Sequence, residues 1–210
     1  MGEAGDVAVR MGAVGTDGAE ARREPPGAAR GPRLLRTVAL VGMMGSGKTA
    51  VGQALALRLR VPFLDSDHAI EEAAQASIAE IFARDGEPFF RDREAEVVAR
   101  LLRGPPAILS TGGGAFLAER NRQAIAASGV AVWLDSDLDA LWERVRHKEG
   151  RPLLQTPDPR ATLAELFERR VPTYRLAGLR VPSGRGCSVE DTVSGVVDAL
   201  AARPDILEDA

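Results

Sequence analysis

The stretch TVALVGMMGSGKT, residues 37–49, decides the fold of this chain. Four apolar residues, 38–41, lead into a glycine-rich segment that ends in Lys48 and Thr49, and residues 50–59 have a helix-like pattern. A short apolar run bounded by glycines is typical of a buried strand. The stretch therefore predicts a strand, a tight loop and the start of a helix, the unit from which parallel α/β sheets are built.

The loop of this unit matches the pattern G-x-x-x-x-G-K-[ST] from Gly42 to Thr49. In this pattern the glycines turn backbone N–H groups toward phosphate oxygens, and the following helix starts at the phosphate. Lys48 is expected to reach the β- and γ-phosphates, and the Thr49 hydroxyl to be one ligand of Mg²⁺. A glycine-rich turn without function is the alternative, but the strand before it and the helix after it provide the context that the motif requires.

Composition favours a single α/β domain. A chain of 210 residues with 45% hydrophobic residues can bury one sizeable core, and two domains would be hard to fit. A formal net charge of −3 gives no electrostatic reason to expect a nucleic acid or an anionic membrane as partner. The single cysteine, Cys187, excludes an internal disulfide, and no apolar run approaches the roughly 18 residues of a membrane span. We expect a cytoplasmic monomer.

Two segments are expected to lie outside the domain, which we place at residues 33–203. Residues 1–32 are rich in Gly, Ala, Arg and Glu with little apolar periodicity, which predicts a disordered N-terminal tail. An organelle transit peptide is the alternative, although such peptides are poor in the acidic residues that this segment carries. Residues 204–210 are expected to form a short C-terminal tail.

Two carboxylates follow the second predicted strand, residues 61–64. Ligands in open α/β sheets bind at the carboxyl ends of strands, which is where Asp65 and Asp67 stand. If the strand stays extended, this spacing puts both side chains on one face, where they could address a metal and a substrate hydroxyl. A helix N-cap role for Asp67, with Asp65 in a solvated turn, is the alternative, and Asp67 could have both roles.

A third strand, residues 107–110, runs into Gly112, Gly113 and Gly114. A plain flexible turn is one interpretation, but a bare backbone at the end of a strand also lets a small ligand come close. Arg91 and Arg93 precede this strand on a predicted helix, as solvated charges or as an anion clamp, and their spacing does not decide between the two.

The segment 148–159 contains a glycine and three prolines, which is typical of a mobile lid within a compact domain. On such a lid Arg151 could stabilise the charge of a transferring phosphoryl group, and a surface arginine on a linker is the alternative. Residues 130–135 and 178–181 predict the fourth and fifth strands. The alternation of strands and helices implies a parallel sheet with right-handed crossovers.

The ordered set of motifs resembles the shikimate kinase family from about residue 37 to about residue 200. The signatures are GMMGSGKT, FLDSD, GEPFFRDRE, STGGG, RPLL and RVPTYR. The resemblance implies an α/β P-loop kinase fold with three α/β/α layers and a five-stranded parallel sheet of strand order 2-3-1-4-5. It also implies transfer of the ATP γ-phosphoryl group to the 3-hydroxyl of shikimate, with Mg²⁺, in aromatic amino-acid biosynthesis.

The resemblance also implies roles for particular residues. Nucleotide binding falls to Gly45, Ser46, Gly47, Lys48, Thr49, Ala50, Arg151 and, loosely, Arg185. The catalytic residues implied are Lys48, Asp67 and Arg151. The implied Mg²⁺ ligands are Thr49 and Asp65, and Ser110 stands beside Asp65 in place of the usual third-strand Asp. Shikimate binding falls to Asp67, Arg91, Gly112, Gly113, Gly114 and Arg175, where the arginines bind the carboxylate. Planar guanidinium groups suit that carboxylate.

Two rival functions remain open. Another kinase of the same fold, for gluconate or a nucleoside monophosphate, should lack the three glycines and the pairing of Phe-Arg with Tyr-Arg. A catalytically silent ATP-binding module would need a damaged motif, and the sequence shows none.

Overall fold

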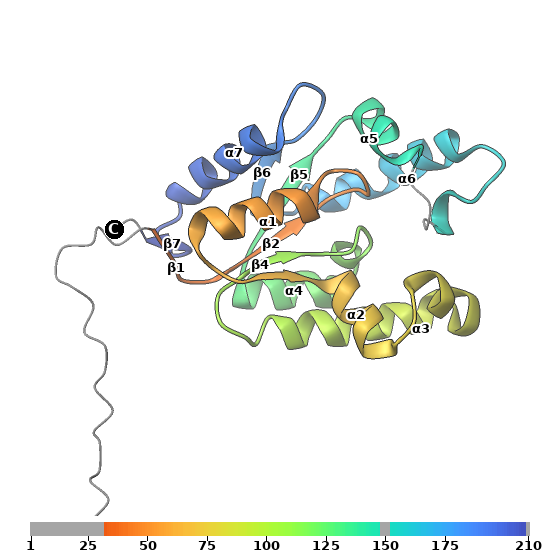
Figure 1. Cartoon of the computed structure of the whole chain (residues 1–210), viewed down its shortest axis with the longest axis horizontal. Helices are drawn as coiled ribbons and strands as arrows, with labels where there is room; N and C mark the ends of the chain where they lie inside the picture. Colours follow the sequence, from red (N-terminus) through yellow and green to blue (C-terminus); the bar gives the residue numbers. More distant parts are fainter. Residues whose placement is uncertain (1–31, 148–151, 209–210) are drawn as a thin grey trace, which may run out of the picture.

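The computed structural model describes residues 32–147 and 152–208. Its centre is a parallel sheet in the spatial order β3-β4-β2-β5-β6 (Figure 1). The strands are β2 (Thr37–Val41), β3 (Phe63–Asp65), β4 (Ile108–Ser110), β5 (Gly129–Asp135) and β6 (Leu179–Pro182). In chain order this arrangement is 2-3-1-4-5, so the expected topology is confirmed.

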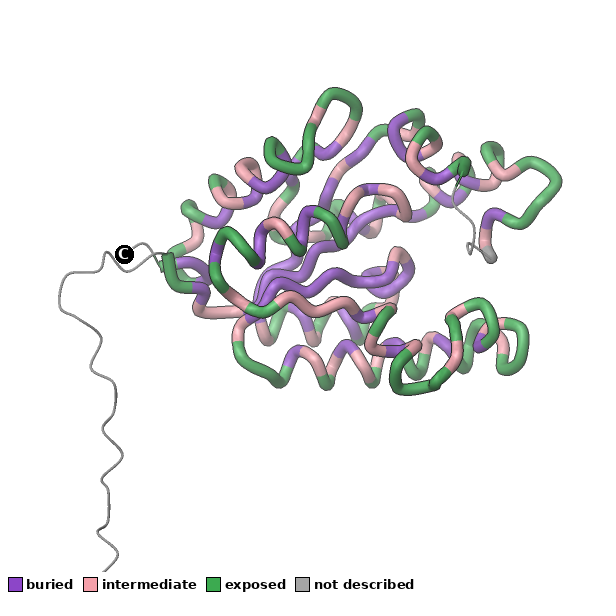
Figure 2. Tube along the Cα trace, viewed as in Figure 1, coloured by how far each residue is buried: buried purple, intermediate pink, exposed green. Residues whose placement is uncertain are grey.

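The central strand β2 is buried along its whole length, as the tube in Figure 2 shows for the middle of the sheet. Val38 pairs in parallel register with Ile108 of β4 and with Val130 of β5. Because helices cover both faces of such a sheet, a central strand needs apolar side chains on both sides. The continuous apolar run that predicted this strand is therefore explained by its position.

Helices pack on both faces of the sheet and give three layers (Figure 1). On one face, α1 (Lys48–Leu59) and α7 (Val189–Ala201) bury their apolar residues against Val38 and Leu40 of β2. On the other, α4 (Glu119–Ser128), α5 (Leu138–Val145) and α6 (Pro159–Tyr174) pack against Ala39 and Val41. Alternate residues of one strand thus enter two separate cores, as the strand period requires.

The helix α2 (Ser66–Ala74) and the first half of α3 (Ile78–Leu101) form a smaller unit at the carboxyl end of the sheet, whereas Val98 in the second half of α3 belongs to the same core as Ala39 and Val41. Ile70, Ile81 and Phe90 make the smaller unit's own apolar core. Gly86 interrupts α3 with a φ of 81° and a ψ of 170°, which redirects the chain before Pro88. Two short 3₁₀ turns, Ala115–Leu117 and Pro152–Leu154, complete the elements at this end.

The last described residues do not extend away from the domain. The strand β7 (Leu207–Glu208) pairs antiparallel with β1 (Arg33–Leu34), and Ile206 and Leu207 lie buried in the core beneath α1 and α7. Residues 204–208 therefore differ from the C-terminal tail that we expected, because their two apolar side chains fill the end of this core. No helix in the described part of the chain is long and apolar enough to cross a membrane.

Candidate active site

The phosphate loop turns between β2 and α1 with three glycines at positive φ. Gly42, Gly45 and Gly47 have φ values of 140°, 83° and 91°. A Cβ atom at Gly45 would lie 2.7 Å from Val145 Cγ1, so this turn excludes a side chain on steric grounds as well as by its backbone angles. Lys48 is nearly buried, and its Nζ donates to the carbonyls of Gly42 and Met43, each at 2.9 Å.

A cavity of about 640 Å³ lies over this loop. Its lining includes Gly45, Gly47, Lys48, Thr49 and Ala50, together with Asp65, Asp67, Ser110, Gly113 and Arg144. Five of the six loop positions expected to bind nucleotide therefore border one space, and the sixth, Ser46, is buried behind it. Backbone N–H groups at a helix start together with an ammonium group form a binding site for phosphate oxygens.

Oxygen atoms suited to a hard cation stand beside Lys48. The Thr49 hydroxyl donates to Asp65 Oδ2 at 3.1 Å and lies 3.4 Å from the Ser110 hydroxyl. Hydroxyl and carboxylate oxygens are ligands of Mg²⁺, which takes few protein ligands besides phosphates and water. The donor set therefore fits the ion that the sequence motif implies.

Asp65 and Asp67 do not share a strand face. The strand β3 ends at Asp65, which caps α2: its Oδ1 accepts from the N–H groups of Asp67 and His68 at 3.0 and 3.4 Å. Asp67 follows in the first turn of the helix and is not the N-cap. The two carboxylates still border the same cavity, because the helix starts at once where the strand stops.

Asp67 has an unusual environment. Its Oδ1 is buried and has no hydrogen-bond partner among the described residues. Burial, and then the neighbouring carboxylate of Asp65, raise the pKa of Asp67 to about 6, and the Lys48 ammonium opposes this shift. Since an unpaired buried oxygen is costly, Asp67 is a strong acceptor for the hydroxyl of a ligand.

A second cavity, of about 460 Å³, adjoins the first and shares Met44, Asp67 and Gly113 with it. Arg91 and Glu94 of α3 and Arg170 of α6 provide charges in its wall. The backbone of residues 112–114 forms another side. This cavity thus offers cations and carboxylates to a small molecule next to the phosphate loop.

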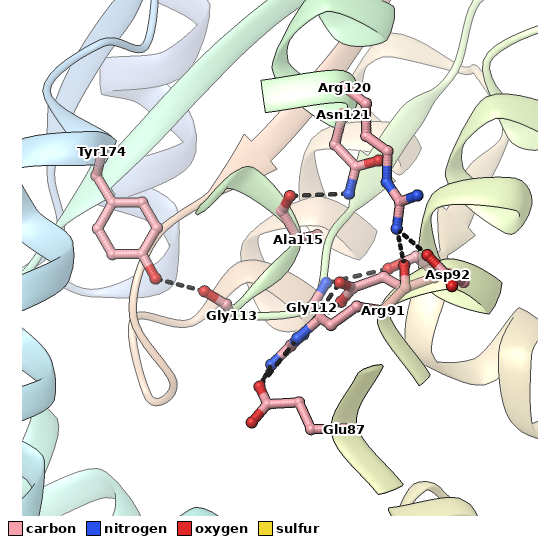
Figure 3. A network of polar contacts seen from close by, with 11 residues as sticks. Glu87, Arg91, Asp92, Gly112, Gly113, Ala115, Arg120, Asn121 and Tyr174 are labelled. Atoms are coloured by element: carbon pink, nitrogen blue, oxygen red, sulfur yellow. Dashed lines mark hydrogen bonds and ion pairs between the residues drawn. The ribbon is translucent and has the colours of Figure 1, made fainter. Parts of the chain in front are cut away.

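Arg91 is held by two carboxylates, one of which, that of Glu87, is labelled in Figure 3. Its Nε and Nη2 donate to Glu87 Oε1 at 3.1 and 2.9 Å, and its Nη1 donates to both oxygens of Glu94 at 3.1 and 3.0 Å. Glu94 is 1% exposed, and burial raises its pKa while Arg91 opposes the shift. The guanidinium group also lies 5.2 Å from the ring centre of Phe90. Arg91 is therefore fixed in place before any ligand arrives.

The glycine wall has almost no spare room. Gly112 donates its N–H to the Ser66 hydroxyl at 3.0 Å. A Cβ atom there would lie 2.5 Å from Asp67 Oδ1 and 2.9 Å from Glu94 Oε1. A Cβ atom at Gly114 would collide with the guanidinium group of Arg91. Gly112 and Gly114 are thus required by the close approach of the charged groups that surround the cavity, whereas a Cβ atom at Gly113 would meet only backbone atoms of the phosphate loop, at 3.4 Å or more.

The second cationic group of this cavity is not the one that the sequence suggested. Arg170 is only 7% exposed and lines the cavity, whereas Arg175 is exposed at the C-terminal end of α6 and does not. Arg170 lies one turn before the buried Tyr174, on the inner side of the helix with Leu163 and Leu166. An arginine within this apolar stripe was the signal available in the sequence.

Other expected residues differ in position or cannot be placed. Arg185 is exposed, donates its backbone N–H to Asp137 Oδ2 at 3.0 Å, and does not line the nucleotide cavity. Arg144, for which the sequence predicted no role, lines the nucleotide cavity, and its Nη1 donates to the carbonyl of Gly45 at 3.2 Å. Arg151 lies outside the described residues.

Known proteins show the same architecture. The family model for shikimate kinase matches residues 44–201. The shikimate kinase of Cereibacter sphaeroides is 64% identical over 176 residues, covering 84% of this chain and 88% of the relative, and that of Ruegeria pomeroyi is 64% identical over 175 residues, covering 83% and 90%. A solved structure, shikimate kinase from Acinetobacter baumannii in complex with shikimate, aligns with a TM-score of 0.77 and 36% identity, covering 80% of this chain and 94% of that one. With its loop, its two adjoining cavities and this degree of identity, the chain belongs to the shikimate kinase family.

Proposed function

We propose that the protein transfers the γ-phosphoryl group of ATP to the 3-hydroxyl of shikimate, giving shikimate 3-phosphate and ADP. The observation that carries the proposal is the junction of the two cavities at Asp67 and Gly113. A phosphoryl donor over the loop and an acceptor in the second cavity would meet there. Holding two reactants in this way removes much of the entropic barrier to their reaction.

On the donor side, the loop N–H groups and Lys48 would bind the phosphates. Thr49 and Asp65 would hold Mg²⁺, with Ser110 beside them, and the ion would neutralise charge on the β- and γ-phosphates. Lys48 now donates to two carbonyls of its own loop, so its ammonium group is already positioned over the phosphate site. Arg144 is the described arginine best placed to contact the nucleotide. Arg151 keeps its proposed role on the lid from the sequence alone.

On the acceptor side, Arg170 and Arg91 would bind the carboxylate of shikimate, in place of the pair Arg91 and Arg175 that we expected. Among the described residues no carboxylate pairs with Arg170, whose side chain is hydrogen-bonded to the Tyr174 hydroxyl, so an anion could still supply its counter-charge. Asp67 and the backbone of the glycine wall would bind the ring hydroxyls. Guanidinium groups recognise carboxylates, and carboxylate or backbone groups recognise hydroxyls.

Asp67 would orient the attacking hydroxyl and accept its proton. A pKa of about 6 leaves the carboxylate mostly ionised above neutral pH while making it a better base than an ordinary aspartate. Because phosphoryl transfer passes through a loose transition state, orientation contributes more than proton removal. The neutral Asn side chain at this position would keep the shape of Asp67 and lose the base.

The test is ADP release by the purified protein with MgATP, run in parallel with shikimate, quinate, gluconate and nucleoside monophosphates. We expect release with shikimate alone. Release with gluconate or a nucleoside monophosphate in its place would assign the acceptor cavity to one of the rival kinases. Nucleotide binding without release in any mixture would support a silent ATP-binding module. A monomeric state and a cytoplasmic location are part of the same proposal, and sedimentation and cell fractionation test them.

A further inference from the structure

Tyr174 is a buried polar residue for which the proposed mechanism has no role. It ends α6, it is 0% exposed, and its ring stacks 6.3 Å from that of Trp133. Its hydroxyl donates a hydrogen bond to the carbonyl of Gly113, which Figure 3 shows, and lies 3.8 Å from the sulfur of Met43. Burial raises the pKa of Tyr174 to about 12, against the opposing effect of Arg170, so the hydroxyl remains a donor at neutral pH.

The carbonyl group that accepts this hydrogen bond, that of Gly113, stands at the junction of the two cavities. Gly113 lines both of them. A Cβ atom on Gly113 would lie 3.4 Å from the backbone nitrogen of Met44 and 3.7 Å from the carbonyl oxygen of Gly42. The glycine wall therefore rests directly on the phosphate loop at this residue, and Tyr174 contacts the same place from α6.

The bond to Gly113 also fixes the following N–H group. A trans peptide is planar, so its C=O and N–H point in opposite directions. Because the carbonyl of Gly113 points to Tyr174, the N–H of Gly114 points away from it. Within the described residues, neither Gly113 nor Gly114 donates its N–H to another group, and both residues line the acceptor cavity. Of these two donors, only the Gly114 N–H belongs to the peptide that Tyr174 holds, so only its direction depends on the present orientation of that peptide.

We propose that Tyr174 is a positioning residue for the acceptor: its hydroxyl holds the peptide between Gly113 and Gly114 so that the Gly114 N–H can donate to a hydroxyl of the bound substrate. This inference rests on the proposed function. Phe at this position would keep the ring packing on Trp133 and would free the carbonyl to rotate, which lets the peptide turn its donor out of the cavity.

The first experiment compares the wild-type protein with Tyr174→Phe. Loss of one neutral hydrogen bond to the substrate predicts a Kd for shikimate that is about 3- to 10-fold weaker by calorimetry. The KM for shikimate should rise in parallel, while the KM for ATP should change by less than about two-fold, because the phosphate loop keeps its own contacts. Leu166→Val is the matched control: it removes a methylene from the same buried side of the same helix without touching the hydroxyl.

A merely structural role for Tyr174 gives a different result. In that case Tyr174→Phe and Leu166→Val would lower Tm to a similar extent and both would keep the wild-type Kd for shikimate, which overturns the proposal. An equal rise in the KM values for shikimate and ATP would also overturn it. So would a loss of affinity on Tyr174→Phe that disappears in an Arg170→Met background, because the hydroxyl would then act through its hydrogen bond with Arg170. Absence of shikimate turnover in the wild-type protein would instead refute the proposed function, so the two failures are distinguishable.

If the Tyr174→Phe protein does not fold, a second measurement tests the proposal on the wild-type protein. In ¹⁵N-labelled wild-type protein, the amide resonance of Gly114 should shift on addition of shikimate, whereas that of Gly195 in α7, which contacts Val181, should not. An unmoved Gly114 resonance at saturating shikimate would refute the proposed donor.

Discussion

Replacing Arg170 tests the acceptor site most directly. Arg170 is buried, lines the acceptor cavity and forms no ion pair within the described part of the chain, whereas Arg91 is already bound to Glu87 and Glu94. The substitution Arg170→Met keeps an unbranched apolar stem in the same space and removes only the charged head. We expect it to weaken shikimate binding while the fold and the nucleotide site stay intact.

The size of the effect follows from the bond that is lost. A hydrogen bond to a charged group contributes about 1.5–3 kcal/mol. Since each 1.36 kcal/mol corresponds to a factor of ten, KM for shikimate should rise by about 10- to 150-fold. The coupled ADP-release assay measures this value at saturating ATP, and calorimetry gives Kd independently. Thermal unfolding must accompany both measurements, because Arg170 also lies next to Tyr174.

The control is Arg175→Met on the same helix. Arg175 is exposed and does not line the cavity, so its substitution should change KM for shikimate by less than about two-fold. The reasoning would be refuted by the reverse pattern, in which Arg175→Met raises KM and a folded Arg170→Met protein behaves as the wild type. Such a result would restore the arginine that the sequence reading had selected.

Three further substitutions test other parts of the structure. Burial raises the pKa of Asp67 to about 6, so in protein without Mg²⁺ or ligand the contribution of Asp67 to stability is present below about pH 4 and is lost as the pH rises through about 6. Asp67→Asn should therefore raise Tm at about pH 8 and raise it little at about pH 4.5, and it should abolish most turnover. Glu87→Gln removes an exposed carboxylate from Arg91, which should lower KM for shikimate by up to about five-fold at low salt and less at high salt, and an increase would show that Glu87 assists binding. Ile206→Ala should lower the free energy of unfolding by about 2–5 kcal/mol in denaturant titrations without changing KM, and an unchanged stability would return residues 204–208 to a tail.

The nucleotide half of the site was the more predictable half because its residues are contiguous. One stretch supplies strand, loop, lysine and hydroxyl, and the structure has the strand at Thr37–Val41 and the helix from Lys48 as expected. The strand order came from the family resemblance and is confirmed. A strand of two residues, such as Leu207–Glu208, is too short to show an alternating pattern, so the closing β1–β7 pair was missed.

The acceptor half is assembled from separate helices, and sequence spacing does not determine which side of a helix faces a cavity. Arg170 and Arg175 lie on different sides of α6, and its inner side, which includes Tyr174, is set by packing against β5. Glu94 lies within the signature GEPFFRDRE, but no role was predicted for it, and the structure buries it against Arg91. Buried charges of this kind break the apolar periodicity of a helix, which makes them candidates for a site once the periodicity is known.

The charges of the acceptor cavity bear on how an acid would be oriented there. Three carboxylates, those of Asp67, Glu71 and Glu94, share its lining with two guanidinium groups, so the cavity is not simply an anion trap. Arg91 is matched by two carboxylates, whereas Arg170 is hydrogen-bonded only to the neutral Tyr174 among the described residues, which leaves Arg170 as the cation that an incoming carboxylate can neutralise without displacing another carboxylate. An acid bound in the reverse direction would place its charge against Asp67, where like-charge repulsion opposes it. A neutral acceptor would leave the buried charge of Arg170 without a counter-charge, which costs more free energy than a missing apolar contact. We therefore expect the protein to select shikimate by orientation: only an acid with its carboxylate at Arg170 brings a hydroxyl to Asp67 at the edge of the phosphate site.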